Sequence, residues 1–209
     1  MSLQGKVALI TGASEDPGSQ VAVALARAGA KVAVEGVAGV QEKVLRTVET
    51  FGGDALPVRG DVLDESDVRH MLSNVEAILG PVDILVNASG LALDKSLEET
   101  DVVDWESAAI SKAKAAYICS KAVVPGMKKR GQGHVISIVS GDGMGTAGGA
   151  AEQALAGFTK ALGQEISGSG VVVARVETGS ADADDVAQGV VLLSGRDSSS
   201  SNASLSVGS

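Results

Sequence analysis

The sequence predicts an α/β protein: a doubly wound parallel sheet of six to seven strands flanked by helices, formed by residues 1–209 as a single domain. Short apolar runs rich in Val, Ile and Ala alternate regularly with longer segments of helical periodicity. Such alternation predicts parallel strands joined by right-handed helical crossovers. The composition agrees, because hydrophobic residues make up 44% of the chain and aromatic residues only 2%. A core of small aliphatic side chains suits strands that are buried on both faces.

The N-terminal half contains short, apolar, β-branched runs that we expect to form strands. These are residues 6–11, 31–35, 55–59 and 83–87. Helices are expected between them, at residues 19–28, at 41–51, and from a cap at Asp64 or Ser66 to about residue 79. A glycine follows each of these segments, and glycine is the residue that most readily ends a helix.

The C-terminal half continues the alternation with longer helices. We expect these at residues 104–129, 150–163 and 184–193. Strands are expected at residues 134–139 and 171–175, with residues 203–207 as an edge strand. The chain has no internal repeat and no linker that would mark a second domain.

Charge and cysteine content exclude several classes of function. The formal net charge is -9 and the isoelectric point is near 4.7, which argues against nucleic acid or an anionic membrane as a partner. The single cysteine, Cys119, excludes an internal disulfide and fits a reducing compartment.

His70 and His134 are too far apart in the sequence to suggest a metal site. Without a long apolar run or a basic leader, we expect a cytoplasmic protein.

Several segments, in their order and spacing, resemble the short-chain dehydrogenase/reductase family. They are residues 5–14 (GKVALITGAS), 60–62 (GDV), 83–90 (DILVNASG), 133–140 (GHVISIVS), 156–162 (AGFTKAL) and 185–187 (DVA). Each segment alone is a weak signal, but together they extend over most of the chain. The pattern is most similar to that of the 3-oxoacyl-carrier-protein reductases.

The resemblance implies a Rossmann-like fold with an NAD(P) site at the carboxyl ends of the strands. It also implies a catalytic set of Asn, Ser, Tyr and Lys, in which the Tyr acts as general acid and base. The positions that match the family's cofactor contacts are Gly12, Ser14, Gly18, Asp61, Val62 and Asn87.

The phosphate-binding loop departs from the family pattern at its middle glycine, which Asp16 replaces. A side chain there obstructs the pyrophosphate, and the carboxylates of Glu15 and Asp16 repel it. Asp16 is alternatively the N-cap of the helix that follows. We therefore expect no bound cofactor, or NAD(P) if the family site still functions. Glu35 ends the second strand, where it either meets the ribose of NAD or is a solvated strand end.

The catalytic positions depart further. In the register that the resemblance gives, the family's Asn falls on Lys112, its Tyr on Gly148 and its Lys on Glu152. Only Ser140 matches, as a remnant, and a serine without its acid and base is equally a polar strand end. We therefore predict no catalytic residues and no metal site.

Tyr117 and Lys121 form a Tyr-x-x-x-Lys pair on one helix face, but they precede the strand that ends at Ser140. In the family that helix packs on a neighbouring subunit, so we interpret the pair as packing or interface residues rather than as a catalytic pair. Its small residues, with those of the helix at 150–163, predict a homo-oligomer, dimer or tetramer.

The sequence analysis thus favours a catalytically inactive member of the family, a pseudoenzyme that acts by association with itself or with an active relative. The connection after Gly179 is also too short for the family's substrate-covering lid. One alternative is an NAD(P)-dependent oxidoreductase for a carbonyl or hydroxyl substrate with a non-standard catalytic group. Another is a sensor that binds a small ligand in the crevice. A further alternative is a family member shortened by a natural or engineered deletion.

Overall fold

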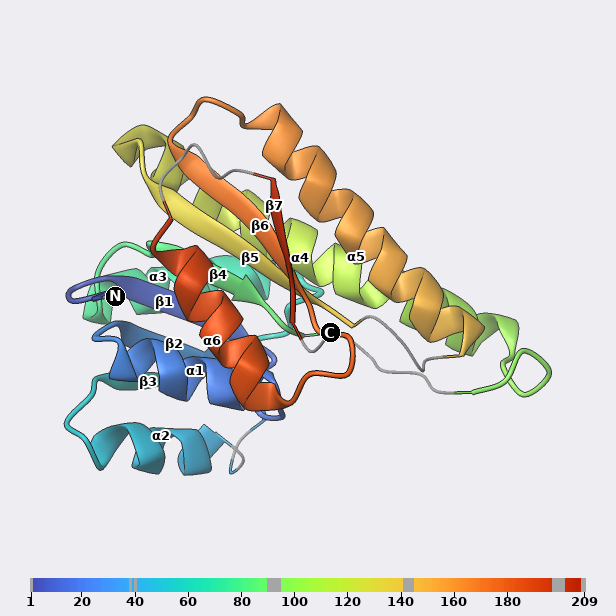
Figure 1. The fold of residues 1–209 in the computed structure, drawn as a ribbon, viewed down its shortest axis with the longest axis horizontal. Coiled ribbons are helices and arrows are strands. Elements are labelled where there is room, and N and C mark those ends of the chain that lie inside the picture. Colours follow the sequence, from blue (N-terminus) through green and yellow to red (C-terminus); the bar gives the residue numbers. More distant parts are fainter. Residues whose placement is uncertain are drawn as a thin grey trace.

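The computed structural model describes residues 2–37, 39, 41–89, 95–140, 145–196 and 202–207. Its strands form one parallel sheet of seven, in the order β3-β2-β1-β4-β5-β6-β7 (Figure 1). The strands are β1 (Val7–Thr11), β2 (Lys31–Glu35), β3 (Ala55–Val58), β4 (Ile84–Asn87), β5 (Gly133–Val139), β6 (Val171–Glu177) and β7 (Ala203–Ser206). The predicted fold class is therefore confirmed.

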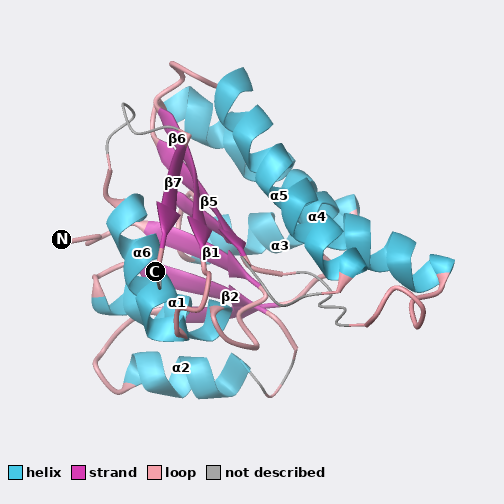
Figure 2. Ribbon diagram, turned by 45° about the vertical axis from the view of Figure 1, so that its right-hand side comes forward, coloured by secondary structure: helices cyan, strands magenta, loops and turns pink. Residues whose placement is uncertain are grey.

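Helices cover both faces of the sheet (Figure 2). They are α1 (Gly18–Arg27), α2 (Gln41–Glu49), α3 (Glu65–Ile78), α4 (Val102–Arg130), α5 (Thr146–Glu165) and α6 (Ala183–Ser194). α1 packs on α6 over one face, and α4 packs on α3 and α5 over the other. In the part of the chain that the structure describes, no helix is both long enough and apolar enough to cross a membrane.

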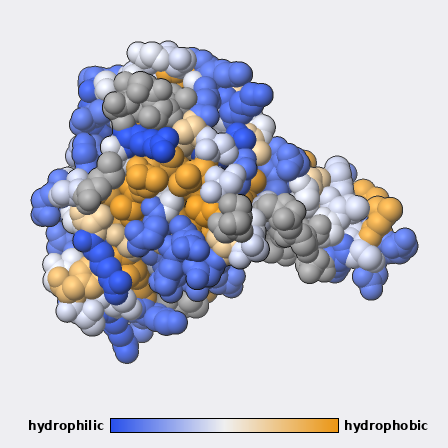
Figure 3. Space-filling model, in the orientation of Figure 1, coloured by the Kyte–Doolittle hydropathy of each residue, from blue (hydrophilic) through white to orange (hydrophobic). Residues whose placement is uncertain are grey.

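The first turns of α4 project beyond the sheet, where they form a narrow extension of the molecule (Figures 1 and 2). Val102 and Val103 are each 71% exposed, and Trp105 is 43% exposed. Figure 3 shows apolar side chains at the tip of this extension. The extension therefore presents an unusual amount of apolar surface to solvent.

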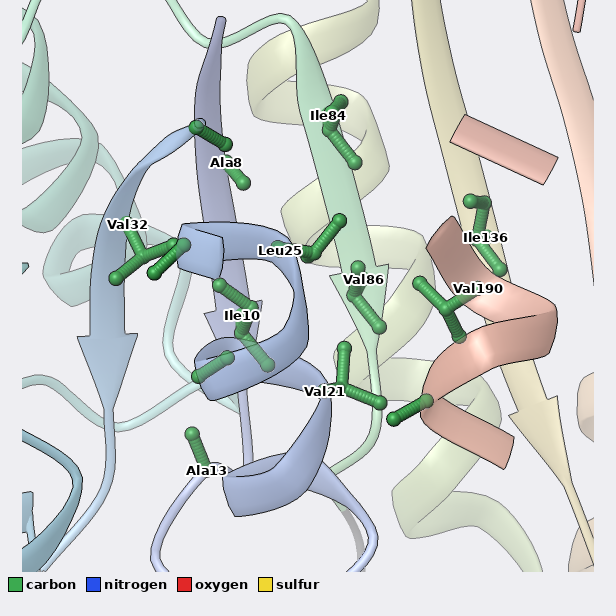
Figure 4. Packing of buried hydrophobic residues seen from close by; sticks show 14 of the residues in the cluster. Ala8, Ile10, Ala13, Val21, Leu25, Val32, Ile84, Val86, Ile136 and Val190 are labelled. Carbon is green, nitrogen blue, oxygen red and sulfur yellow. The ribbon is translucent and has the colours of Figure 1, made fainter. Parts of the chain in front are cut away.

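The larger core cluster lies between the sheet and the α1–α6 pair (Figure 4). Ile10, Val86 and Ile136 come from neighbouring strands, and Val21 and Val190 cover them from α1 and α6. These side chains are almost completely buried. Small aliphatic residues fill this layer, as the low aromatic content predicts.

The strand order reverses at β1, because the chain continues to β2 on one side and returns to β4 on the other. Thr11 and Asn87 are partners in the β1–β4 register and stand at the carboxyl ends of these two strands. In open α/β sheets this reversal point is where ligands bind. The fold therefore places the candidate site between Thr11 and Asn87.

Every predicted helix and strand is present, with shifts at some ends. Asp64 rather than Ser66 caps α3, since its carboxylate accepts the backbone N–H groups of Ser66 and Asp67. α5 begins at Thr146, before the predicted residue 150. α6 begins at Ala183, because the side chain of Asp182 accepts the N–H of Asp185 and caps the helix.

Candidate functional site at the carboxyl ends of the strands

The ends of β1 and β4 are joined by the hydroxyl of Thr11. It donates to the carbonyl of Val86 at 3.3 Å, and it accepts the N–H of Ala88 at 3.3 Å and the hydroxyl of Ser89 at 3.0 Å. Thr11 is 1% exposed, so these bonds form in a nearly dry environment. They fix the floor of the crevice.

Gly12 and Gly18 allow the loop after β1 to pack closely. Gly12 has a φ of +68°, and a Cβ there would lie 2.6 Å from the Cα of Ser89. A Cβ on Gly18 would lie 2.5 Å from the carbonyl oxygen of Gly12. Both glycines are therefore required by contacts within the chain itself, whatever they contribute to a cofactor.

Ser14 connects the same loop to the end of β2. Its hydroxyl accepts the N–H of Val37 at 2.6 Å, and a Cβ on Gly36 would lie 2.0 Å from that hydroxyl oxygen. Ser14 also lines a hollow of about 240 Å³ together with Glu15, Asp16 and Lys43. The hollow brings one lysine close to the two acidic residues of the loop.

Glu35 does not project into solvent, so its interpretation as a solvated strand end is wrong, whereas the contact with the ribose of NAD stays a prediction. It is 9% exposed, and its carboxylate accepts the N–H of Gly12 at 2.8 Å. Burial raises the pKa of Glu35 above the ordinary value of 4.5, the bond from Gly12 opposes this rise, and the negative charge of Asp61 adds to it.

Because its pKa is raised in the folded chain, Glu35 should destabilise the protein progressively as the pH rises above 4.5. The unfolded chain gives up this proton first, which favours unfolding. We expect Glu35→Gln, which keeps a bond acceptor for Gly12, to gain stability relative to the unaltered protein as the pH rises above 4.5. Urea unfolding of both proteins across this range measures the difference. Parallel pH profiles would contradict the expectation.

Asp16 is not the N-cap of α1, which corrects one of the alternatives for this residue. The N-cap position is Pro17, and no side chain caps the helix. The carboxylate of Asp16 instead accepts the hydroxyl of Ser19, and both Glu15 and Asp16 are exposed. These carboxylates face the solvent at the phosphate end of the crevice.

Asp61 and Val62 stand between β3 and α3. The carboxylate of Asp61 accepts the N–H of Leu63 at 2.8 Å, and its own N–H donates to the side chain of Asp67 at 3.0 Å. Asp61 is exposed and Val62 partly exposed. The turn therefore presents both residues at the carboxyl end of β3, as an adenine contact would require.

Asn87 is the residue of the crevice whose polarity has no explanation within the described chain. It is 3% exposed, yet neither its amide nitrogen nor its amide oxygen has a hydrogen-bond partner among the described residues. A buried unpaired amide costs about 1–3 kcal/mol in stability. Such a group at the reversal point of the sheet fits a site that a polar ligand completes.

A buried ion pair occupies the positions that the resemblance assigns to catalysis. The ammonium of Lys112, on α4, donates to one carboxylate oxygen of Glu152, on α5. The other oxygen of Glu152 accepts the backbone N–H of Ser140 at 2.8 Å, at the end of β5. The side chains of Lys112 and Glu152 are 13% and 3% exposed. α4, β5 and α5 are thus joined at one point.

Tyr117 and Lys121 lie on α4 in the groove between α4 and α5. The ring of Tyr117 meets the edge of Phe158 at 6.3 Å between centroids, with an interplanar angle of 83°. Lys121 pairs with Glu65 of α3 at 3.1 Å. Tyr117 therefore packs α4 on α5, and Lys121 links α4 to α3.

The Lys112–Glu152 pair is the feature of the site that sequence reasoning missed. The resemblance placed both residues at catalytic positions, but only as departures from the expected side chains. The opposite charges of Lys112 and Glu152 were the signal that could have revealed the pair, because a buried charge needs a partner of the opposite sign. Among the described residues, no group of three or more potential ligands is placed to hold a metal ion.

Comparison with known proteins finds chains of similar sequence and fold among short-chain oxidoreductases. The profile of the family described as short chain dehydrogenase matches residues 6–189. The chain is 36% identical over 190 residues to the 3-oxoacyl-[acyl-carrier-protein] reductase FabG of Pseudomonas aeruginosa, covering 88% of this chain and 77% of that protein. It is 35% identical over 181 residues to nodulation protein G of Azospirillum brasilense, covering 83% and 74%.

A solved structure of a short-chain oxidoreductase has the same fold as this chain. The crystal structure of a metagenomic short-chain oxidoreductase in complex with NADP superposes with a TM-score of 0.90 at 28% identity, covering 99% of this chain and 98% of that one. These relatives do not support the prediction of an inactive protein, and they agree better with the alternative of an oxidoreductase. The expectation that no cofactor binds is likewise not confirmed.

Proposed function

Because the chain belongs to the short-chain dehydrogenase family, we propose that it binds an NAD(P) dinucleotide and interconverts a carbonyl and a hydroxyl group on a small substrate. The observation that carries this proposal is the unpaired amide of Asn87, buried where the strand order reverses. The named relatives support a 3-oxoacyl thioester as the first substrate class to test.

Along most of the crevice, the residues that line it are compatible with a bound dinucleotide. Gly12 and Gly18 bring backbone close to the start of α1, whose N-terminus favours a phosphate group. Lys43 supplies a positive charge in the hollow beside Asp16, and Asp61 stands at the adenine end. The bound dinucleotide supplies a hydride, and the protein's own residues orient it and manage the proton.

The exposed carboxylates of the loop weaken this site but do not close it. Two like charges 4 Å apart repel by about 4 kcal/mol at an effective dielectric constant of about 20, and solvent and salt reduce this for exposed groups. We therefore expect Asp16→Gly to bind NADH and NADPH about tenfold more tightly than the unaltered protein does, as about 1.4 kcal/mol of repulsion is removed.

Thermal unfolding at increasing concentrations of each dinucleotide measures this change. The matched control is Asp54→Gly, which removes an exposed carboxylate at the other end of the sheet, beside β3. Equal affinities in all three proteins would mean that the dinucleotide does not occupy the loop after β1. Oxidation of NADH or NADPH in the presence of acetoacetyl-CoA tests the oxidoreductase activity itself.

A second candidate, a non-catalytic subunit, is favoured by one specific observation. Gly148 offers no phenol at the position of the family's Tyr, and both oxygens of Glu152 are engaged within the chain. The two candidates differ in one outcome, since a non-catalytic subunit leaves acetoacetyl-CoA unchanged even when a dinucleotide binds. We retain as predictions the cytoplasmic location and a truncated substrate-binding lid after Gly179, where residues 178–182 connect β6 to α6.

A further inference from the structure

We infer that Lys112 gives the proton to the substrate oxygen, an inference that rests on the proposed oxidoreductase function. Lys112 lies near the carboxyl end of β5. There the carboxylate of Glu152 accepts hydrogen bonds from both the ammonium of Lys112 and the backbone N–H of Ser140. In the register of the family, the catalytic Lys falls on the position of Glu152 on α5, whereas in this chain the lysine is Lys112 on α4. The site therefore keeps an ammonium, although its position in the sequence has changed.

The ammonium of Lys112 can donate more hydrogen bonds than Glu152 accepts from it. An ammonium carries three N–H donors, and Glu152 is the acceptor that the described part of the chain provides for it. The side chain of Lys112 keeps 13% of its surface exposed, whereas Glu152 keeps 3%. Lys112 is thus the less buried member of the pair, and the carboxylate of Glu152 is the member that holds it.

Gly148 is buried on α5 beside this pair. It stands four residues before Glu152 on α5, and residues at this spacing lie on the same helix face. Since glycine has no side chain, the face of α5 that carries Glu152 presents only backbone at the preceding turn. A substrate carbonyl bound at this pair would meet the ammonium of Lys112 rather than a phenol.

The proposed step balances without another reactant. The carbonyl carbon receives a hydride from the reduced dinucleotide as the C=O π bond breaks, and the carbonyl oxygen takes one proton from Nζ of Lys112. New C–H and O–H bonds form, the carbonyl is reduced, and the dinucleotide is oxidised. Lys112 is left neutral beside Glu152 and regains its proton from water.

Lys112→Met and Lys112→Arg separate proton donation from charge, because a guanidinium keeps its charge and does not give up a proton in proteins. With NADPH or NADH and acetoacetyl-CoA, we expect kcat to fall about a hundredfold or more in both variants. The affinity for dinucleotide should stay unchanged. Lys114→Met, an exposed lysine on the same helix, is the matched control and should keep its rate.

Binding of 3-hydroxybutanoyl-CoA, measured by calorimetry, tests the contact without turnover. We expect affinity to fall about tenfold in Lys112→Met, the loss of one charge-assisted hydrogen bond, and to be largely kept in Lys112→Arg. If Lys112→Met does not fold, the double variant Lys112→Met with Glu152→Leu removes both charges. Its affinity for 3-hydroxybutanoyl-CoA is then compared with that of the unaltered protein in the same way.

The outcomes separate this inference from the proposed function. An unaltered protein that neither binds a dinucleotide nor reduces acetoacetyl-CoA overturns the proposed function. An active protein whose Lys112→Arg or Lys112→Met variant keeps its kcat overturns only the role of Lys112. Unchanged affinity of Lys112→Met for 3-hydroxybutanoyl-CoA also overturns that role, whether or not turnover is seen.

Discussion

Replacing Glu152 with leucine should lower the free energy of unfolding by about 3–5 kcal/mol, since it leaves a nearly buried ammonium without its partner. Glu152 is 3% exposed and binds both Lys112 and the backbone N–H of Ser140. The variant therefore loses an ion pair and a backbone bond in one change. Urea unfolding at pH 7 measures the loss.

The double variant Lys112→Met with Glu152→Leu should recover much of this stability, because no unpaired charge remains in the interior. The exposed pair Lys121–Glu65 is the matched comparison, with both side chains about half exposed, and Glu65→Leu should change stability by about 1 kcal/mol or less. If Glu152→Leu and Glu65→Leu cost the same, the buried pair does not hold α4 to α5.

Tyr117→Glu should convert a dimer of this protein to monomers at micromolar concentration. We propose that a second copy covers the groove of about 770 Å³ between α4 and α5, which Tyr117, Phe158, Val124 and Leu162 line. Tyr117 is 50% exposed in the single chain. A carboxylate in this apolar groove would be desolvated without a partner in the dimer.

The charges around the groove support a two-fold arrangement. Lys121 and Lys128 border it on α4, and Glu165 borders it on α5, so a two-fold axis can place the lysines of one copy against the glutamate of the other. A stable interface of this kind buries more than about 1,000 Å² in total.

Light scattering of the purified protein decides the oligomeric state. Ile78→Glu is the matched control, because Ile78 is 57% exposed on α3, outside the groove, and this variant should remain a dimer. A monomeric unaltered protein, or a dimer that survives Tyr117→Glu, would contradict the proposed interface.

The fold was predictable because local signals and the overall topology agree. The β-branched runs, the glycines after helices and the cap at Asp64 each identify an element within a few residues. The start of α5 was placed too late because Thr146–Ala150 contains two glycines, which are poor helix formers by themselves. Packing of α5 on α4 and β5 overrides that local preference.

The site was less predictable, because the roles of its polar residues depend on contacts distant in sequence. Glu35 bonds Gly12, 23 residues away, and Lys112 bonds Glu152, 40 residues away. Periodicity cannot reveal such pairs, since it reports only which residues share a face. The resemblance assigned Lys112 and Glu152 to catalytic positions, but it did not show that the two residues would bind each other.

Calorimetric titration of the unaltered protein with NADPH and with NADH, up to millimolar concentration, tests the central claim most directly. The account predicts saturable one-site binding, lost when Asn87 is replaced by leucine of similar size, because the buried amide of Asn87 then has no polar atom to offer the ligand. Absence of heat with both dinucleotides, in a protein that unfolds cooperatively, would contradict it.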